Sequence, residues 1–278
     1  MPRVKAAVVG HVEWVEFARV ETVPRPGDVV HASEVWAEAA GGGAVAAVQL
    51  VNLGCETLFF TALGDDELGK RSRVQLERQG VILHAATVDD ATRRAFTHVD
   101  QAGERTITVL GEKLRPAGDD ASQPWEELGR CDCVYFVSGD VASLRKARRA
   151  NVMVATAREL PTLRRGGVQL DALVGSALDT GERYQSGELD PPPTLVVATS
   201  GHLGGWAQPG GPYGAAEKPG PIEDAYGAGD CFAAGLTFAL GRGDEPMDAI
   251  ALASRCGATV VTGRGPYGRQ LGGGELQD

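Results

Sequence analysis

The sequence has little cysteine and no pattern of cysteines that would form a disulfide framework. Its five cysteines are odd in number and scattered, mostly within apolar segments, which favours reduced, buried thiols. The only close pair is Cys131 and Cys133, and no second Cys or His pair at zinc spacing accompanies it. We therefore expect this pair to lie in a strand rather than at a metal.

Positive charge and long apolar runs are also scarce. Lys and Arg number 27 against 37 Asp and Glu, a formal net charge of -10, which disfavours nucleic acid or an anionic membrane as a partner and favours a small molecule. No stretch approaches the roughly 20 apolar residues of a membrane span. Residues 1–14 lack the layout of a signal peptide, so we expect a cytoplasmic protein.

Strand and helix patterns alternate along most of the 278 residues. We expect a single α/β domain over 1–278, with a doubly wound, mainly parallel sheet and helices on both faces. Strands are expected at 4–10, 57–64, 81–88, 133–139, 151–157, 170–176 and 194–201, and helices at 44–54, 66–80, 143–150, 228–241 and 246–262.

Two segments interrupt this alternation. Residues 12–38 have extended character, and residues 93–110 form two alternating runs about a turn, which predicts a hairpin. We expect strands from both segments to form a small antiparallel lid beside the main sheet. The last residues, 268–278, are expected to be a loose tail.

Glycine is abundant, with 38 residues, and two glycine patterns imitate nucleotide motifs. Residues 64–71, GDDELGKR, match a phosphate-binding loop except for Arg71 at the position of the Ser or Thr that binds Mg²⁺. Their three acidic residues would also repel a triphosphate. Residues 41–46, GGGAVA, fit a dinucleotide fingerprint but do not follow a clean first strand. We favour neither interpretation.

The segment 223–235, EDAYGAGDCFAAG, indicates an anion site. Gly227, Ala228 and Gly229 are small enough to let backbone amides approach an anion, and the helix expected from residue 228 points its positive end there. Asp230 in the first helical turn is placed to accept a proton from an attacking hydroxyl. A purely structural role for Asp230 at the helix start remains the alternative.

This segment resembles the D-T-x-G-A-G-D-x-F signature of the ribokinase-like carbohydrate kinase family, to which residues 224–232 correspond. Further segments resemble family motifs in the same order along the chain: the glycine motif at 40–54, the strand and loop at 61–69, the hairpin segment at 103–107, and the nucleotide loop T-x-G-x-x-G at 199–204. The resemblance implies ATP-dependent phosphorylation of a sugar or nucleoside hydroxyl, a doubly wound sheet with a β-lid, and a homodimer through that lid.

The resemblance also implies residue roles. Asp230 corresponds to the catalytic base and Gly227, Ala228 and Gly229 to the anion hole for the γ-phosphate. The remaining matches are Thr199, Gly201 and Gly204 in the nucleotide loop, Gly41 and Gly42 at the sugar pocket, and Asp224 near phosphate and Mg²⁺.

Several positions depart from the family pattern. The family's sugar-binding Asp and Asn are replaced by Val15 and Val45, which would leave the hydroxyls of an ordinary sugar unpaired. Glu13 and Glu16 are candidate substitutes, and Trp14 could stack on a ring or be a rim aromatic.

The family's N-x-x-E motif, linked to Mg²⁺, is here Ser176 to Asp179, and Ala225 replaces the Thr of the signature. We therefore expect an ATP- and Mg²⁺-dependent kinase acting on an unusual sugar-like or nucleoside-like acceptor. The alternative is a catalytically weak relative that binds a metabolite or nucleotide, and a nicotinamide oxidoreductase is a distant third.

Overall fold

A computed structural model describes residues 3–277 and contains one large sheet with the strand order β13-β12-β11-β10-β9-β8-β1-β4-β5. Neighbours from β11 to β5 pair in parallel, and β12 and β13 add antiparallel pairs at one edge. The strands are β1 (Lys5–Val9), β4 (Glu56–Gly64), β5 (Ile82–Val88), β8 (Cys133–Phe136), β9 (Val152–Thr156), β10 (Ala172–Ser176), β11 (Leu195–Thr199), β12 (Gly205–Gln208) and β13 (Gly211–Tyr213).

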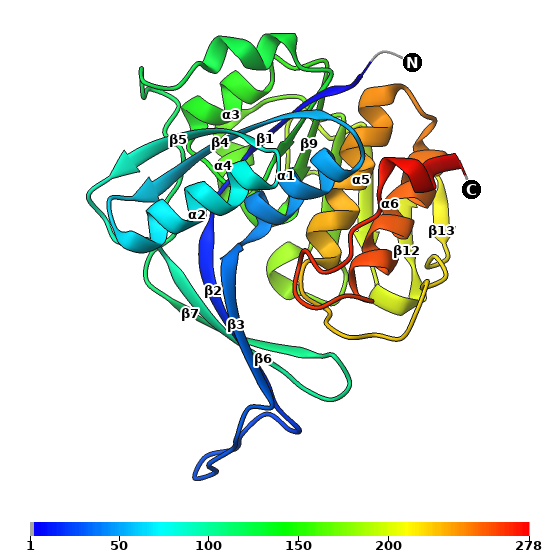
Figure 1. The fold of residues 1–278 in the computed structure, drawn as a ribbon. Coiled ribbons are helices and arrows are strands. Elements are labelled where there is room, and N and C mark those ends of the chain that lie inside the picture. The colour runs from blue at the N-terminus through cyan, green and yellow to red at the C-terminus, as the bar shows by residue number, and fades with distance from the viewer. Residues whose placement is uncertain (1–2, 278) are drawn as a thin grey trace.

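Helices cover both faces of this sheet (Figure 1). One face packs against α1 (Gly42–Asn52), α2 (Glu67–Arg78), α5 (Ala228–Arg242) and α6 (Pro246–Val260), and the other against α3 (Val141–Ala147) and α4 (Leu160–Gly166). Side chains of β1 alternate between the two cores, with Ala6 and Val8 in the first and Ala7 and Val9 in the second, as a strand buried on both sides requires. The predicted doubly wound α/β fold is confirmed.

The order of the strands reverses between β1 and β8. From β1 the chain proceeds to β4 and β5 on one side, and from β8 to β11 on the other. In open parallel sheets, the crevice outside the carboxyl ends of the strands at such a reversal is where ligands bind. This rule directs attention to the residues that follow β1 and β8.

A second, four-stranded sheet projects from the body with the order β3-β2-β6-β7 (Figure 1). Its strands are β2 (Glu13–Arg19), β3 (Glu34–Ala40), β6 (Arg94–Val99) and β7 (Arg105–Leu110). They come from the two segments predicted to form the lid, although β2 and β6 pair in parallel rather than antiparallel. We call this sheet the lid.

The predicted elements differ from the observed ones in a few places. Helix α5 begins at residue 228 as predicted, whereas α1 begins two residues earlier than expected. Helix α4 and the hairpin β12–β13 were not predicted. The tail is not loose over its described part, because Leu271 is buried and its carbonyl accepts a hydrogen bond from the Gln49 side chain.

Within residues 3–277, none of the helices has the length and apolar character that crossing a bilayer requires. The cytoplasmic location stays a prediction.

Candidate active site

Helix α5 begins with an open amino terminus. Its N-cap, Gly227, has a φ of 84°, and no side chain caps the helix. Helix α2, in contrast, is capped by Asp66, whose carboxylate accepts from the Gly69 amide at 2.7 Å. A Cβ added at Gly229 would meet no atom within 4 Å. The first-turn amides of α5 therefore face open space with no side-chain acceptor, which is the requirement for an anion site.

Asp230 lies directly against the glycine motif. A Cβ added at Gly42 would come within 2.8 Å of Asp230 Oδ1, so only glycine leaves room for a ligand between this carboxylate and the start of α1. Burial raises the pKa of Asp230 to about 6, while the nearby Arg105 and Arg158 act in the opposite direction. The structure thus pairs a half-buried carboxylate of raised basicity with an open helix terminus.

Asp224 and Tyr226 hold the loop in front of α5. Asp224 is fully buried and accepts from the Tyr226 amide at 2.8 Å and the Gly265 amide at 3.1 Å. The Tyr226 hydroxyl accepts from the Gly41 amide at 3.3 Å. Both Asp224 oxygens are engaged by backbone, so this residue fixes the loop geometry in the structure. Burial raises its pKa despite these bonds.

The lid contacts the same loop. The Arg105 side chain donates to the Ala225 carbonyl, the Ala225 amide donates to Gly103 O at 2.8 Å, and Arg19 donates to Glu223 O at 3.1 Å. At the lid base, the Phe17 ring meets Tyr226 edge-on at 5.1 Å. The lid and the segment before α5 are therefore joined on the side where Asp230 lies.

Gly41 lies beside the segment that follows β1. Its φ is 86°, and a Cβ there would lie 3.2 Å from Glu13 Cγ and 3.3 Å from His11 Cδ2. Because a Cβ added at Gly42 would lie beside Asp230 Oδ1, one of the two adjacent glycines faces Glu13 and His11 and the other faces the candidate base. The charge of Glu13 also raises the pKa of Asp230, as the smallest of several effects.

Val15 and Val45 are fully buried. Val45 Cγ1 lies 3.0 Å from where a Cβ of Gly227 would be, so its side chain supports the loop before α5 from below. The structure gives Val45 this packing contact, and a contact between Val45 and an acceptor stays a prediction.

The predicted nucleotide loop joins β11 to β12. Thr199 ends β11, and its hydroxyl donates to Gly175 O at 3.3 Å. Gly201 and Gly204 have φ values of 57° and 88°, and a Cβ at Gly204 would lie 2.0 Å from Tyr213 O. Both positions favour glycine, because other residues are strained at these positive φ values. Because β11 is parallel to β1, the loop lies at the same edge of the sheet as His11.

Asp179 is engaged by protein donors. Its Oδ1 accepts from the Gly181 amide at 2.8 Å and its Oδ2 from Arg158 at 2.7 Å, and Arg158 also pairs with Glu182. Ser176 Oγ accepts from the Leu178 amide. Neither Asp179 nor Asp224 offers an unpaired oxygen, and no three His, Cys, Asp or Glu side chains gather as a metal-binding group between residues 3 and 277. Each oxygen of Asp179 and Asp224 thus already accepts a hydrogen bond, and a direct role of either residue in binding Mg²⁺ stays a prediction.

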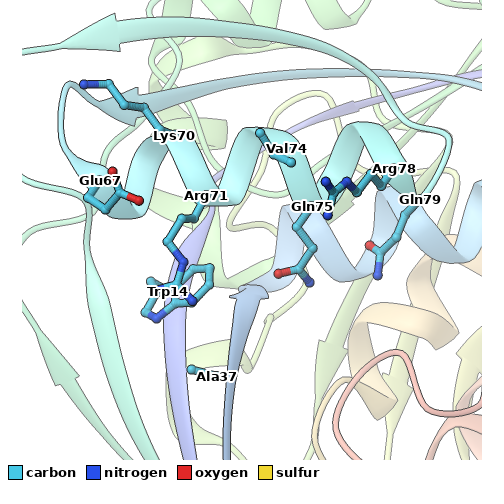
Figure 2. A pocket seen from close by; sticks show the side chains of 9 residues that line it. All are labelled: Trp14, Ala37, Glu67, Lys70, Arg71, Val74, Gln75, Arg78 and Gln79. Carbon is cyan, nitrogen blue, oxygen red and sulfur yellow. The ribbon is translucent and has the colours of Figure 1, made fainter.

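A groove of about 500 Å³ between the lid and α2 contains none of the predicted site residues (Figure 2). Trp14 lies there, with the Arg71 guanidinium 4.3 Å from its ring centroid. Neighbouring side chains of a strand point to opposite faces, and Glu13 faces Gly41. Trp14 packs under Arg71 on the other side of the lid, which favours the rim aromatic over stacking on the acceptor, and its role stays a prediction.

Two basic residues near the site were missed by sequence reasoning. Arg93 Nε lies 3.2 Å from Glu13 Oε1, and Lys113 adds positive potential at both Glu13 and His11. They lie in connecting segments at the two ends of the hairpin, in no motif. Isolated basic residues beside strands carry no sequence signal that separates them from solvated ones.

Comparison with known proteins identifies the family of this chain. The chain matches the model of the pfkB family carbohydrate kinases over residues 4–162 and 170–270. The chain belongs to this family, and it is accordingly a carbohydrate kinase of the ATP-dependent, sugar-phosphorylating type.

Curated relatives and solved structures agree with the family. An ATP-dependent ribose-1-phosphate kinase of Halopiger xanaduensis is 27% identical, over 93% of this chain and 92% of its own. A fructokinase of Salmonella typhimurium is 28% identical, over 83% and 90%. Among solved structures, ribokinase from Thermotoga maritima has a TM-score of 0.76 at 20% identity, covering 99% of this chain and 98% of its own. The ADP complex of Cryptococcus neoformans ribokinase has a TM-score of 0.74 at 21% identity, covering 96% and 97%.

Proposed function

We propose that this kinase transfers the γ-phosphoryl of ATP to a hydroxyl of a sugar-like or nucleoside-like molecule, with Asp230 as the base. The observation that carries the proposal is the placement of Asp230 in the first turn of the uncapped helix α5, against Gly42. A pKa of about 6 leaves this carboxylate ionised near neutral pH yet more basic than an ordinary aspartate. It can orient the attacking hydroxyl and accept its proton as the bond to phosphorus forms.

The amides of Gly227, Ala228 and Gly229 would hold the γ-phosphoryl oxygens. Their support is the glycine N-cap and the open space at Gly229. Negative charge grows and spreads on the transferring group, and fixed amides aimed at it stabilise that charge. Thr199, Gly201 and Gly204 would bind the rest of the nucleotide through the β11–β12 loop.

Mg²⁺ would enter with ATP, since this ion is commonly held by phosphates, water and few protein groups. When bound, it neutralises phosphate charge. Because Asp179 and Asp224 are fully engaged, we assign them no direct coordination. Asp179 remains a candidate for contact through water, and Asp224 shapes the phosphate loop.

The acceptor would lie beside Gly41 and Gly42, with Glu13 receiving hydrogen bonds from its hydroxyls. The named substrates of the relatives differ, one being ribose 1-phosphate and the other fructose as the word fructokinase implies. Val15 and Val45 cannot hydrogen-bond sugar hydroxyls, which agrees with an acceptor other than an ordinary sugar.

The test is acceptor-dependent ADP release with MgATP over sugars, sugar phosphates, sugar acids, nucleosides and polyols. We expect at least one acceptor to be turned over, with a rate that declines below about pH 6 as Asp230 is protonated. Asp230→Asn should lower kcat by about 10²- to 10⁴-fold, the range for loss of a general base. Unchanged turnover in that variant would remove Asp230 from the mechanism.

A second candidate function is a metabolite- or nucleotide-binding protein with weak catalysis. Its support is the engagement of Asp179 by Arg158 and the two buried valines. Calorimetry separates the two: tight ATP binding with no turnover of any acceptor supports the binding protein.

We also propose a homodimer formed through the lid. Strand β7 is exposed along its length, with apolar Ile107, Val109 and Leu110 each 40–44% exposed. An apolar edge strand of this kind is stabilised when a second sheet covers it.

A further inference from the structure

A group of charged residues lies at the end of the acceptor site opposite Asp230. A Cβ added at Gly42 would lie 2.8 Å from Asp230 Oδ1, and one added at the preceding Gly41 would lie 3.2 Å from Glu13 Cγ and 3.3 Å from His11 Cδ2. Adjacent Cα atoms are about 3.8 Å apart. A molecule with its hydroxyl at Asp230 that extends along these two glycines therefore reaches Glu13 within the length of a small sugar.

Lys113 supplies a cation that the protein does not fully neutralise, and its charge acts on both Glu13 and His11. Arg115 takes both oxygens of Glu159, at 2.7 and 2.9 Å, which leaves Lys113 Nζ at 3.6 Å from that carboxylate. Within residues 3–277 the Lys113 ammonium makes no hydrogen bond, although its side chain is only 17% exposed. Burial lowers the pKa of Lys113, and the neighbouring Arg115 and Arg93 add to this effect.

Arg93 is the second cation. Its Nε lies 3.2 Å from Glu13 Oε1 without hydrogen-bond geometry, so this buried donor is unpaired in the described chain. Its side chain is 15% exposed. Three cations, Arg93, Lys113 and Arg115, thus face two carboxylates, Glu13 and Glu159.

His11 lies against Glu13 and leaves the net charge of the group unchanged. The residue is 8% exposed, its Nε2 lies 3.5 Å from Glu13 Oε1, and its Cδ2 edge faces Gly41. Burial lowers the pKa of His11, so it remains neutral near pH 7 and does not add a fourth positive charge.

Building on the proposed kinase function, we propose that the acceptor carries an anionic group, a phosphate or a carboxylate, held by Lys113 and Arg93 at the end of the site remote from Asp230. Glu13 accepts hydrogen bonds from the hydroxyls between. The three cations exceed the two carboxylates by one positive charge, and the anion would neutralise it. A neutral sugar would leave the Lys113 ammonium without a hydrogen-bond partner and would be disfavoured.

Calorimetry on the full chain tests the proposal with matched probes: D-ribose against D-ribose 1-phosphate and D-ribose 5-phosphate, and D-glucitol against D-gluconate. We expect an anionic probe to bind at least tenfold more tightly than its neutral counterpart. Lys113→Gln should weaken that binding about ten- to hundredfold through loss of a charge-assisted hydrogen bond. Lys113→Arg, which retains the charge, should recover part of it.

Lys70→Gln is the matched control, because Lys70 is an exposed lysine of α2 that pairs with Asp65. Tight binding of the phosphates alone identifies a sugar phosphate, and of gluconate alone a sugar acid. Equal binding of neutral and anionic probes, no binding of any anionic probe, or equal effects of Lys113→Gln and Lys70→Gln would overturn the inference.

Different results would overturn the proposed kinase function and the proposed anion site. Binding that depends on Lys113 with no release of ADP would leave the inference standing and overturn the proposed function. Turnover of neutral sugars that is insensitive to Lys113 would do the reverse.

Discussion

Asp230 illustrates how one residue can serve a reaction and weaken the fold. Its burial raises its pKa from 3.8 to about 6, so the native state disfavours the charged form relative to the unfolded chain. At pH 7 the carboxylate is ionised in both states, so the cost of burying its charge lowers the stability of the native protein. A carboxylate of this kind persists where chemistry requires it.

Replacing Asp230 by Asn should therefore raise stability while removing turnover. Asn has nearly the same shape and no charge, so we expect the free energy of unfolding at pH 7 to rise by about 1–3 kcal/mol. In a chain of this size, that corresponds to a rise in Tm of several degrees. Thermal denaturation beside the ADP-release assay measures both effects.

The pH dependence of this gain serves as its control. The penalty from a raised carboxyl pKa is fully present above about pH 6 and is lost as pH falls towards the unfolded value of 3.8. The stability advantage of Asp230→Asn should thus shrink by about half between pH 7 and pH 5. A gain that stays constant over this range would show that desolvation of the charge is not its cause.

The starts of helices α2 and α5 show how capping decides what a helix terminus can bind. Asp66 caps α2 and also bonds the Thr92 amide and hydroxyl, so its amino terminus is closed to any anion. This explains physically why the phosphate-loop pattern at 64–71 is not a nucleotide site. At α5 the N-cap is Gly227, which has no side chain, and the amides remain available.

Alanine at Gly229 and at Gly227 should separate function from folding within α5. Gly229→Ala meets no atom and improves helix propensity, so stability should rise by about 0.5–1 kcal/mol. Its new methyl group occupies the space proposed for the γ-phosphoryl, so KM for ATP or kcat should worsen at least tenfold. Chemical denaturation and steady-state kinetics check the two parts.

Gly227→Ala should behave in the opposite way for stability. It forces a side chain into a positive φ and against Val45 at 3.0 Å, which should destabilise the protein by about 1–3 kcal/mol. If Gly229→Ala retained full activity, the anion site would not lie at this helix terminus.

At the scale of the whole molecule, the lid combines two tasks on one small sheet. Its end at the β6–β7 turn joins the loop before α5 through Arg105, Gly103 and Arg19, while the side chains along its edge strand β7 are open to solvent. A sheet of four strands with an exposed apolar edge is a natural surface for association. Dimerisation through the lid would cover this edge.

We expect the protein to sediment as a dimer and Ile107→Asp to sediment as a monomer, because a charge in an apolar interface is strongly disfavoured. Met247→Asp is the matched control, since both side chains are 40% exposed and Met247 lies on α6 in the body. Analytical ultracentrifugation over a range of concentrations measures the difference. A monomeric wild-type protein, or equal effects of the two variants, would contradict the lid dimer.

Much of the fold could be predicted because its patterns are local. The start of α5 follows from small residues and an apolar run at 227–240, and the buried strands follow from short β-branched and aromatic runs. Helix α4 has only seven residues, and β12 and β13 have four and three. Elements this short carry too few residues for a periodicity to appear.

The sequence by itself determined the class of fold, the kinase signature and the candidate base, because these depend on residues that are neighbours in the chain. Only the tertiary structure decided what the side chains face. It turned Trp14 towards α2, engaged Asp179 with Arg158, and buried Val45 beneath Gly227. It also brought Lys113 and Arg93 to Glu13 from separate segments. Such contacts depend on strand order and pleat, which no local pattern specifies.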